Sequence, residues 1–82
     1  MIKIKVVKDT TIVDQLTVDP SLTTLRQLRD LINPPLAKEW LVADGEDLIG
    51  YELEAKMMCE DSIDKANKIF FKLTPPITTN NQ

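Results

Sequence analysis

The sequence predicts an α+β domain in which one helix packs against four or five short strands. Residues 2–7 and 12–18 alternate between apolar and polar side chains, as half-buried strands do. One amphipathic helix follows them, and further strand-like runs occupy residues 39–43 and 68–73. At 82 residues the chain has room for one domain, which we assign to residues 1–74, followed by an extended or flexible tail over 75–82.

The first two runs predict a hairpin. In residues 2–7 the aliphatic side chains fall on one face, while Lys3 and Lys5 fall on the other, which must then meet solvent. Residues 12–18 alternate poorly near Asp14 and regularly towards Val18. Because the polar link between the two runs is short, we expect the strands to pair side by side.

A helix is predicted after Pro20, which cannot donate to a sheet ladder and so ends the second strand. Thr24 is a suitable N-cap, and Gln27 three residues later completes a capping box. The expected buried stripe is Leu25, Leu28, Leu31 and Ile32, with Arg26, Arg29 and Asp30 directed to water. Asn33-Pro34-Pro35 ends the helix, because a residue before proline resists helical geometry.

The second half of the chain is less regular. Residues 39–43 predict a third strand that ends at an Asp44-Gly45 turn, and Leu48 opens a short fourth strand. Residues 49–67 show a weak pattern, in which one helical turn would direct Leu53, Met57 and Met58 inward. Residues 68–73 form a strong last strand, in which Phe70 and Lys72 face away from Ile69, Phe71 and Leu73.

Charge and composition exclude several classes of protein. Net charge is −3, which argues against general nucleic-acid binding. Residues 39–64 carry −8 and the rest of the chain +5, a separation that can steer a charged protein partner or merely solvate a loop-rich segment. There is no apolar run of membrane-spanning length, no secretion signal and a single cysteine, so we expect a cytoplasmic, reducing location and no membrane partner.

The side chains for catalysis are sparse, and we expect no enzyme activity and no cofactor or metal. The chain has no histidine, the commonest general base and metal ligand. Cys59 has no histidine to activate it, and its acidic neighbours disfavour a thiolate. The paired carboxylates lack the spacing of a calcium loop, and no glycine-rich phosphate loop is present.

The order of elements resembles the β-grasp fold of the ubiquitin-like superfamily, from Met1 to about Leu73. Several runs resemble that family in order: Val18-Asp19-Pro20 before the helix, Pro34-Pro35 after it, Leu41-Val42-Ala43-Asp44-Gly45 followed by Leu48, and Ile63 six residues before Ile69. The resemblance implies a mixed sheet of four to five strands packed on one helix. It also implies that the first and last strands lie side by side at the centre, with the third strand next to the last.

The chain departs from the family in ways that bear on function. Ubiquitin-type modifiers and sulfur carriers act through a C-terminal diglycine, whereas here Leu73 precedes Thr-Pro-Pro-Ile-Thr-Thr-Asn-Asn-Gln. The only glycines are Gly45 and Gly50. The resemblance therefore favours a member that is not conjugated, and counts against a protein modifier or sulfur-carrier relative. Extra residues also stand around 49–54, and the helix is one residue longer.

The orientation of the third strand decides the candidate site. No charged side chain fixes its faces, so either Leu41 and Ala43 or Trp40 and Val42 point to the core. The resemblance favours Leu41 inward, which would place Trp40 and Val42 outward beside Phe70. The alternative buries the indole, which is valuable in a small core.

In the outward arrangement the free sheet face carries an apolar patch with a basic rim. Its expected partner-binding residues are Trp40, Val42, Phe70, Lys72, Lys3 and Lys5. Aromatic anchors and long basic side chains are typical of protein interfaces, so we expect a protein partner with an acidic surface. The resulting hypothesis is a non-conjugated ubiquitin-like interaction module, an adaptor that is monomeric. The alternative is a structural subunit of a larger assembly that pairs through its edge strands or tail.

Overall fold

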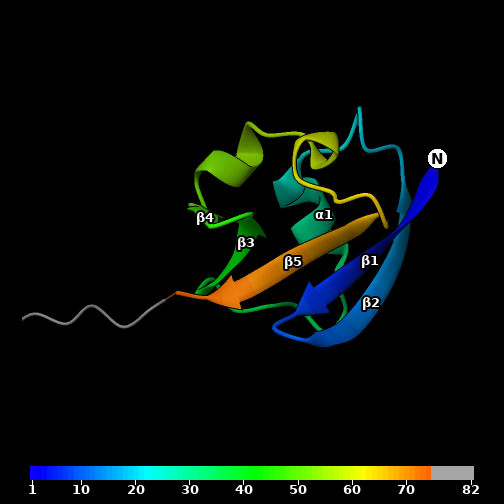
Figure 1. Cartoon of the computed structure of the whole chain (residues 1–82). Coiled ribbons are helices and arrows are strands. Elements are labelled where there is room, and N and C mark those ends of the chain that lie inside the picture. Colours follow the sequence, from blue (N-terminus) through cyan, green and yellow to red (C-terminus); the bar gives the residue numbers. More distant parts are fainter. Residues whose placement is uncertain (75–82) are drawn as a thin grey trace, which may run out of the picture.

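A computed structural model of the chain describes residues 1–74. It is an α+β structure in which a mixed five-stranded sheet packs on one helix (Figure 1). The strand order is β2-β1-β5-β3-β4. The elements are β1 (Ile2–Lys8), β2 (Thr11–Val18), α1 (Leu25–Leu31), β3 (Trp40–Asp44), β4 (Asp47–Ile49), the short 3₁₀ turns η1 (Leu53–Ala55) and η2 (Cys59–Asp61), and β5 (Lys68–Leu73).

The first and last strands lie side by side at the centre of the sheet, as the resemblance implied. β1 and β5 run parallel, and β1 pairs antiparallel with β2 as a hairpin. β3 lies next to β5 and pairs antiparallel with both β5 and β4. The tail predicted for 75–82 lies outside the described residues. The five-stranded mixed sheet with one helix is thus confirmed.

The start of α1 follows the predicted capping box. The Thr24 hydroxyl accepts from the Gln27 backbone N–H, and the Gln27 side chain accepts from the Thr24 backbone N–H. One part of the predicted stripe was wrong, because Leu31 is 53% exposed. At about 100° per residue, Leu31 lies roughly 120° around the axis from Leu25. Ile32 returns to the buried side and takes its place.

The hydrophobic core lies between the helix and one face of the sheet, called here the inner face. It is formed by Ile4, Val6, Val18, Leu25, Leu28, Ile32, Val42, Ile49, Cys59, Ile69 and Phe71. Phe71 is the largest fully buried side chain. The lysines of β1 and β5 force the alternate aliphatic residues of these strands inward, which is why the core is centred on these two strands.

The irregular alternation of the second strand is explained by a β-bulge. The pairing of β1 with β2 shifts between Val6 and Val7, so that Val6 lies opposite Asp14 and Val7 opposite Ile12. An extra residue in one strand disturbs the two-residue period there. Val13, the extra residue, packs against the core.

The inward expectation for Leu41 was wrong, and so was the outward expectation for Val42. Val42 is 0% exposed and lies opposite Phe71, whose ring is also in the core. Residues directly opposite in a sheet project to the same face, so the pairing with Phe71 turns Val42 inward. Trp40 lies on the same inner face, half-buried against the core, and Leu41 is turned away.

A buried ion pair holds the segment before β3. Arg29 was expected to face water, but it is 4% exposed, and Glu54 is 0% exposed. Arg29 Nε and Nη2 donate to the two Glu54 carboxylate oxygens at 2.7 Å each. Arg29 also donates to the backbone carbonyls of Ala37 and Trp40. One guanidinium thus ties α1 to η1 and to the start of β3.

The region after β4 is compact although its sequence pattern is weak. Two short 3₁₀ turns replace the single helical turn that the sequence predicted. Met57 packs against the core as expected, whereas Leu53 is 46% exposed and its inward placement was wrong. The buried residue of η1 is Glu54, because it meets Arg29 there.

Loss of the Glu54 charge should destabilise the fold strongly. Glu54→Gln leaves the Arg29 guanidinium buried without a counter-charge, which typically costs about 3–5 kcal/mol of the free energy of unfolding. Urea unfolding followed by tryptophan fluorescence measures this loss. Glu52→Gln is the matched control, because Glu52 is exposed and should change stability by roughly 0.5 kcal/mol at most.

A double variant tests whether the unpaired buried charge causes the loss of stability in Glu54→Gln. Arg29→Met combined with Glu54→Met leaves no buried charge, so it should regain part of the stability that Glu54→Gln loses. If Glu54→Gln unfolds at the same urea concentration as Glu52→Gln, the ion pair does not hold the fold.

Candidate functional site

The sheet face opposite the helix, called here the outer face, carries one continuous line of apolar side chains. Cross-strand pairs connect Ile12 to Val7, Val7 to Phe70, Phe70 to Ala43, and Ala43 to Leu48. The line therefore crosses β2, β1, β5, β3 and β4 in turn. We call these five residues, Ile12, Val7, Phe70, Ala43 and Leu48, the apolar row.

The apolar row is separate from the core. Val7 is 5% and Ala43 7% exposed, yet neither belongs to the core cluster under the helix. The other members of the row are more accessible, since Phe70 and Leu48 are half-buried and Ile12 is 47% exposed. The row thus ends in accessible side chains at β2 and has Phe70 at its centre.

Lysines lie beside the row on the same outer face. Lys5 stands opposite Lys68 on β5. Lys3 lies two residues before Lys5 on the same face, and Lys72 lies two residues after Phe70. Lys3 and Lys72 are exposed, while Lys5 and Lys68 are half-exposed. The predicted basic rim of Lys3, Lys5 and Lys72 therefore shares one face with Phe70, and Lys68 joins it.

The structure does not bring Trp40 or Val42 to this face. Val42 is enclosed in the core, and the Trp40 ring lies on the inner face with Lys8 Nζ 4.8 Å from its centroid. Leu41 and Ala43 take the outward positions instead. The sequence did hold a signal for the row: Val6 and Val7 are consecutive and apolar, and consecutive strand residues point to opposite faces.

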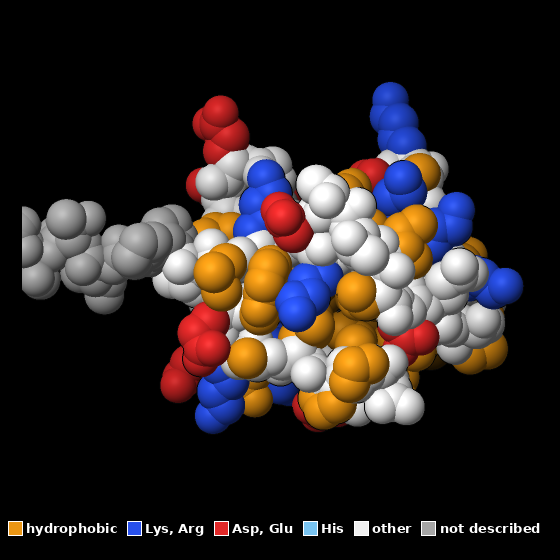
Figure 2. Space-filling view, turned by 90° about the horizontal axis from the view of Figure 1, so that it is seen from below, with side chains coloured by type: hydrophobic (Ala, Val, Ile, Leu, Met, Phe, Trp, Pro, Cys, Tyr) orange, Lys and Arg blue, Asp and Glu red, His pale blue; other side chains and the backbone are white. Residues whose placement is uncertain are grey.

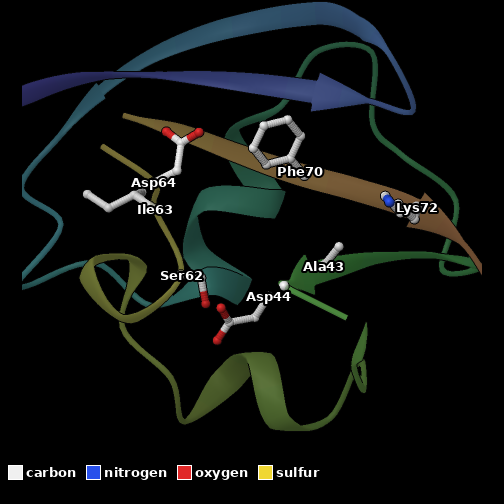
Figure 3. A pocket seen from close by; sticks show the side chains of 8 residues that line it. Ala43, Asp44, Ser62, Ile63, Asp64, Phe70 and Lys72 are labelled. Carbon is white, nitrogen blue, oxygen red and sulfur yellow. The ribbon is translucent and has the colours of Figure 1, made fainter. Parts of the chain in front are cut away.

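A pocket of about 360 Å³ opens beside Ala43 and Phe70 of the row. Its walls come from the end of β3, from β5 and from the loop after η2 (Figure 3). The lining residues are Ala43, Asp44, Gly45, Ser62, Ile63, Asp64, Phe70 and Lys72. Gly45 has φ +64°, a left-handed conformation that glycine adopts without strain, and it turns the chain tightly into β4.

The polar groups of the pocket are mostly acceptors. Asp64 Oδ1 accepts from the backbone N–H groups of Ala66 at 2.8 Å and Lys68 at 2.9 Å, which fixes the loop before β5. Ser62 is 8% exposed, and its buried hydroxyl has no hydrogen-bond partner among residues 1–74. Figure 3 shows the Ser62 hydroxyl and the Asp44 carboxylate pointing toward one another across one side of the pocket.

Exposed apolar side chains also occur away from the outer face. The large ones include Met1, Leu22, Leu31, Leu53 and Leu73. In the view from below, hydrophobic side chains gather across the middle of the surface with Lys and Arg side chains among them (Figure 2). Exposure alone therefore does not single out a site. The outer face differs because its apolar residues form one line, and two of them, Ala43 and Phe70, also line a pocket.

The cysteine among the described residues is buried. Cys59 is 0% exposed, its Sγ lies 3.5 Å from the Thr24 carbonyl oxygen, and burial raises the pKa of its thiol to about 11. Within residues 1–74 no group of three His, Cys, Asp or Glu side chains is placed to hold a metal ion. In the same part of the chain, no helix has the length and apolar character needed to cross a bilayer.

The Cys59 thiol should resist alkylation in the folded protein. At pH 8 its raised pKa keeps the thiol protonated, and burial blocks access, so iodoacetamide should modify it only after unfolding. The raised pKa also makes the stability of the fold depend on pH. The Cys59 thiol contributes fully to stability below its unfolded-state pKa, and this contribution is lost as the pH rises towards 11. Mass spectrometry with and without urea checks the first result; rapid native labelling at pH 8 would contradict it.

Comparisons of the chain with protein-family models, with curated proteins and with solved structures found no match.

Proposed function

We propose that this chain is a ubiquitin-like β-grasp module that binds a protein segment non-covalently on its outer sheet face. The observation that carries the proposal is the apolar row, which crosses all five strands and has lysines beside it. The proposal keeps the expected face, with Phe70 and the lysines, and replaces Trp40 and Val42 by the residues of the row.

The strand arrangement supports the β-grasp part of this proposal. The strand order 2-1-5-3-4, with the first and last strands parallel at the centre, is the arrangement that the resemblance implied. Helix α1 packs on one face of the sheet and leaves the other face without a helix in the described residues (Figure 1). Antiparallel and mixed sheets with one solvated face usually alternate apolar inward and polar outward. An apolar line on the uncovered face departs from that rule and supports a binding role.

The chemistry of the outer face points to one kind of partner. Phe70 and Leu48 offer a shallow apolar surface that suits aliphatic side chains. Lys3 and Lys5 on β1, with Lys68 opposite Lys5 on β5, attract carboxylates. The partner segment should therefore carry leucine- or isoleucine-like residues in a row, with acidic residues beside them. An amphipathic helix meets these requirements because its apolar residues form a stripe.

The edge strands give less support to assembly with other copies. β4 has only three residues, and β2 is interrupted by the bulge opposite Val6 and Val7. Short edges and bulges are features that prevent strand addition. The subunit hypothesis also invoked the tail, which lies outside the described residues. We therefore keep the binding module as the proposal.

The proposal predicts that a peptide binds at the apolar row and not at α1, and that the loss of the Phe70 side chain weakens this binding. The probe is a synthetic amphipathic helical peptide with a leucine stripe flanked by glutamates, titrated into labelled protein and followed by NMR amide shifts. Shifts should concentrate on the apolar row, and Phe70→Asp should weaken the dissociation constant by about tenfold or more. Ile12→Asp serves as a second variant, because Ile12 is half-exposed and its loss should not affect folding.

Leu31→Asp is the matched control, since it places the same charge at an exposed leucine of α1. It should bind the peptide as the unaltered protein does. A version of the peptide flanked by lysines should bind more weakly than the glutamate version, because of the lysines beside the row. Shifts on α1 instead of the row, or equal losses in Leu31→Asp and Ile12→Asp, would refute the proposed surface.

A further inference from the structure

We infer that the pocket beside Ala43 and Phe70 receives an arginine side chain of the same partner segment. The inference rests on the proposed function, because the pocket opens directly from the apolar row: Ala43 and Phe70 belong to both. A segment lying on the row would therefore bring one of its side chains to the mouth of the pocket. The chemistry of the lining decides which side chain fits.

The apolar part of the lining suits a long, flat side chain. Ala43, Ile63 and Phe70 contribute the nonpolar wall, and the Phe70 ring projects from β5 (Figure 3). The methylene groups of an arginine can pack on such a wall while its guanidinium continues to the polar end. A guanidinium also stacks favourably on an aromatic ring.

The polar part of the lining presents acceptors that require a donor. Two carboxylates, Asp44 and Asp64, line the pocket against one cation, Lys72, so the charges favour a positive group. The Ser62 hydroxyl, which is buried in the pocket wall, also lacks a hydrogen-bond partner among the described residues. The Ser62 side chain is more than nine-tenths buried, and it faces Asp44 within the pocket.

Arginine meets these requirements better than lysine does. Its planar guanidinium carries five N–H donors in a fixed fork, so that it can donate to the Asp44 carboxylate and to the Ser62 hydroxyl from one position. A lysine ammonium is more strongly hydrated and has no flat face to lay against Phe70. The second carboxylate, Asp64, is held in place by its two backbone hydrogen bonds and contributes its charge without needing to move.

The two charge preferences of the outer face belong to different parts of the partner. Lys3 and Lys5 lie on β1, on the far side of Phe70 from the pocket, whereas Asp44 stands where β3 ends. The inferred segment therefore has acidic residues towards β1 and one arginine towards the β3 end, with aliphatic residues between them. This order would fix the direction in which the segment lies across the sheet.

Short peptides test the pocket separately from the rest of the surface. Acetyl-Leu-Arg-Leu-amide and acetyl-Leu-Gln-Leu-amide differ only in the guanidinium side chain, and each is titrated into labelled protein with NMR amide shifts as the readout. The arginine peptide should shift residues 43–45 and 62–64 and bind about fivefold more tightly than the glutamine peptide, a preference that falls as salt rises.

Three variants locate the preference. Asp44→Asn and Ser62→Ala should each reduce the preference for arginine, and Asp47→Asn should leave it unchanged. Asp47 is the matched control, because it pairs with Asp44 in the same hairpin and loses the same charge but does not line the pocket. The amide spectrum of each variant is compared with that of the unaltered protein, and a matching spectrum shows that the variant is folded.

The outcomes separate this inference from the proposed function. If both peptides shift the apolar row equally and residues 62–64 do not respond, the row binds aliphatic segments but the pocket does not select arginine, and the inference is wrong. If Asp47→Asn lowers the preference as much as Asp44→Asn, general charge attraction is the cause and the inference is again wrong. If neither short peptide shifts the outer face but the helical leucine–glutamate peptide does, the inference is wrong and the proposed function stands; if that helical peptide also leaves the outer face unshifted, the proposed function fails with it.

Discussion

The buried contact between Arg29 and Glu54 is the interaction on which the rest of the structure depends. It joins residues 25 positions apart, and the same guanidinium also donates to the carbonyl groups of Ala37 and Trp40. Both charges are out of water, so each is tolerable only because the other is present. Arg26 adds a second link from the helix, since its Cζ lies 3.6 Å from the centroid of the Tyr51 ring and its guanidinium donates to the Tyr51 backbone carbonyl. The irregular region after β4 is thereby fastened to the helix.

This contact also bears on the outer face, because it fixes the chain where β3 begins. With the Trp40 carbonyl bound to Arg29 and Trp40 opposite Leu73, Val42 meets Phe71 inside and Ala43 meets Phe70 outside. A shift of one residue would reverse every side chain of β3. The apolar row and the pocket both include Ala43, so both depend on this register. A polar interaction on the helix side thus holds the start of the strand that carries Ala43 to the opposite side of the sheet.

Much of the fold could be predicted from the sequence, and the site only in part. The lysines at positions 3, 5 and 72 set the faces of β1 and β5, and Thr24 with Gln27 set the helix start. β3 contains no charged residue before Asp44, so its faces depend on pairing with a distant strand, which local patterns do not contain. Arg29 was expected in water because its counter-ion lies 25 residues away, in a segment without clear periodicity. Ser62 gave no sequence signal, since its importance comes from burial alone.

The register of β3 against β5 is the most direct test of this account, and cross-strand nuclear Overhauser effects measure it. We expect backbone contacts between Val42 and Phe71 and between Ala43 and Phe70, together with methyl contacts from Val42 to the core. Contacts that place Leu41 opposite Phe71 would mean that the strand is shifted by one residue. In that case Ala43 would turn inward, the apolar row would be broken at β3, and the account would be wrong.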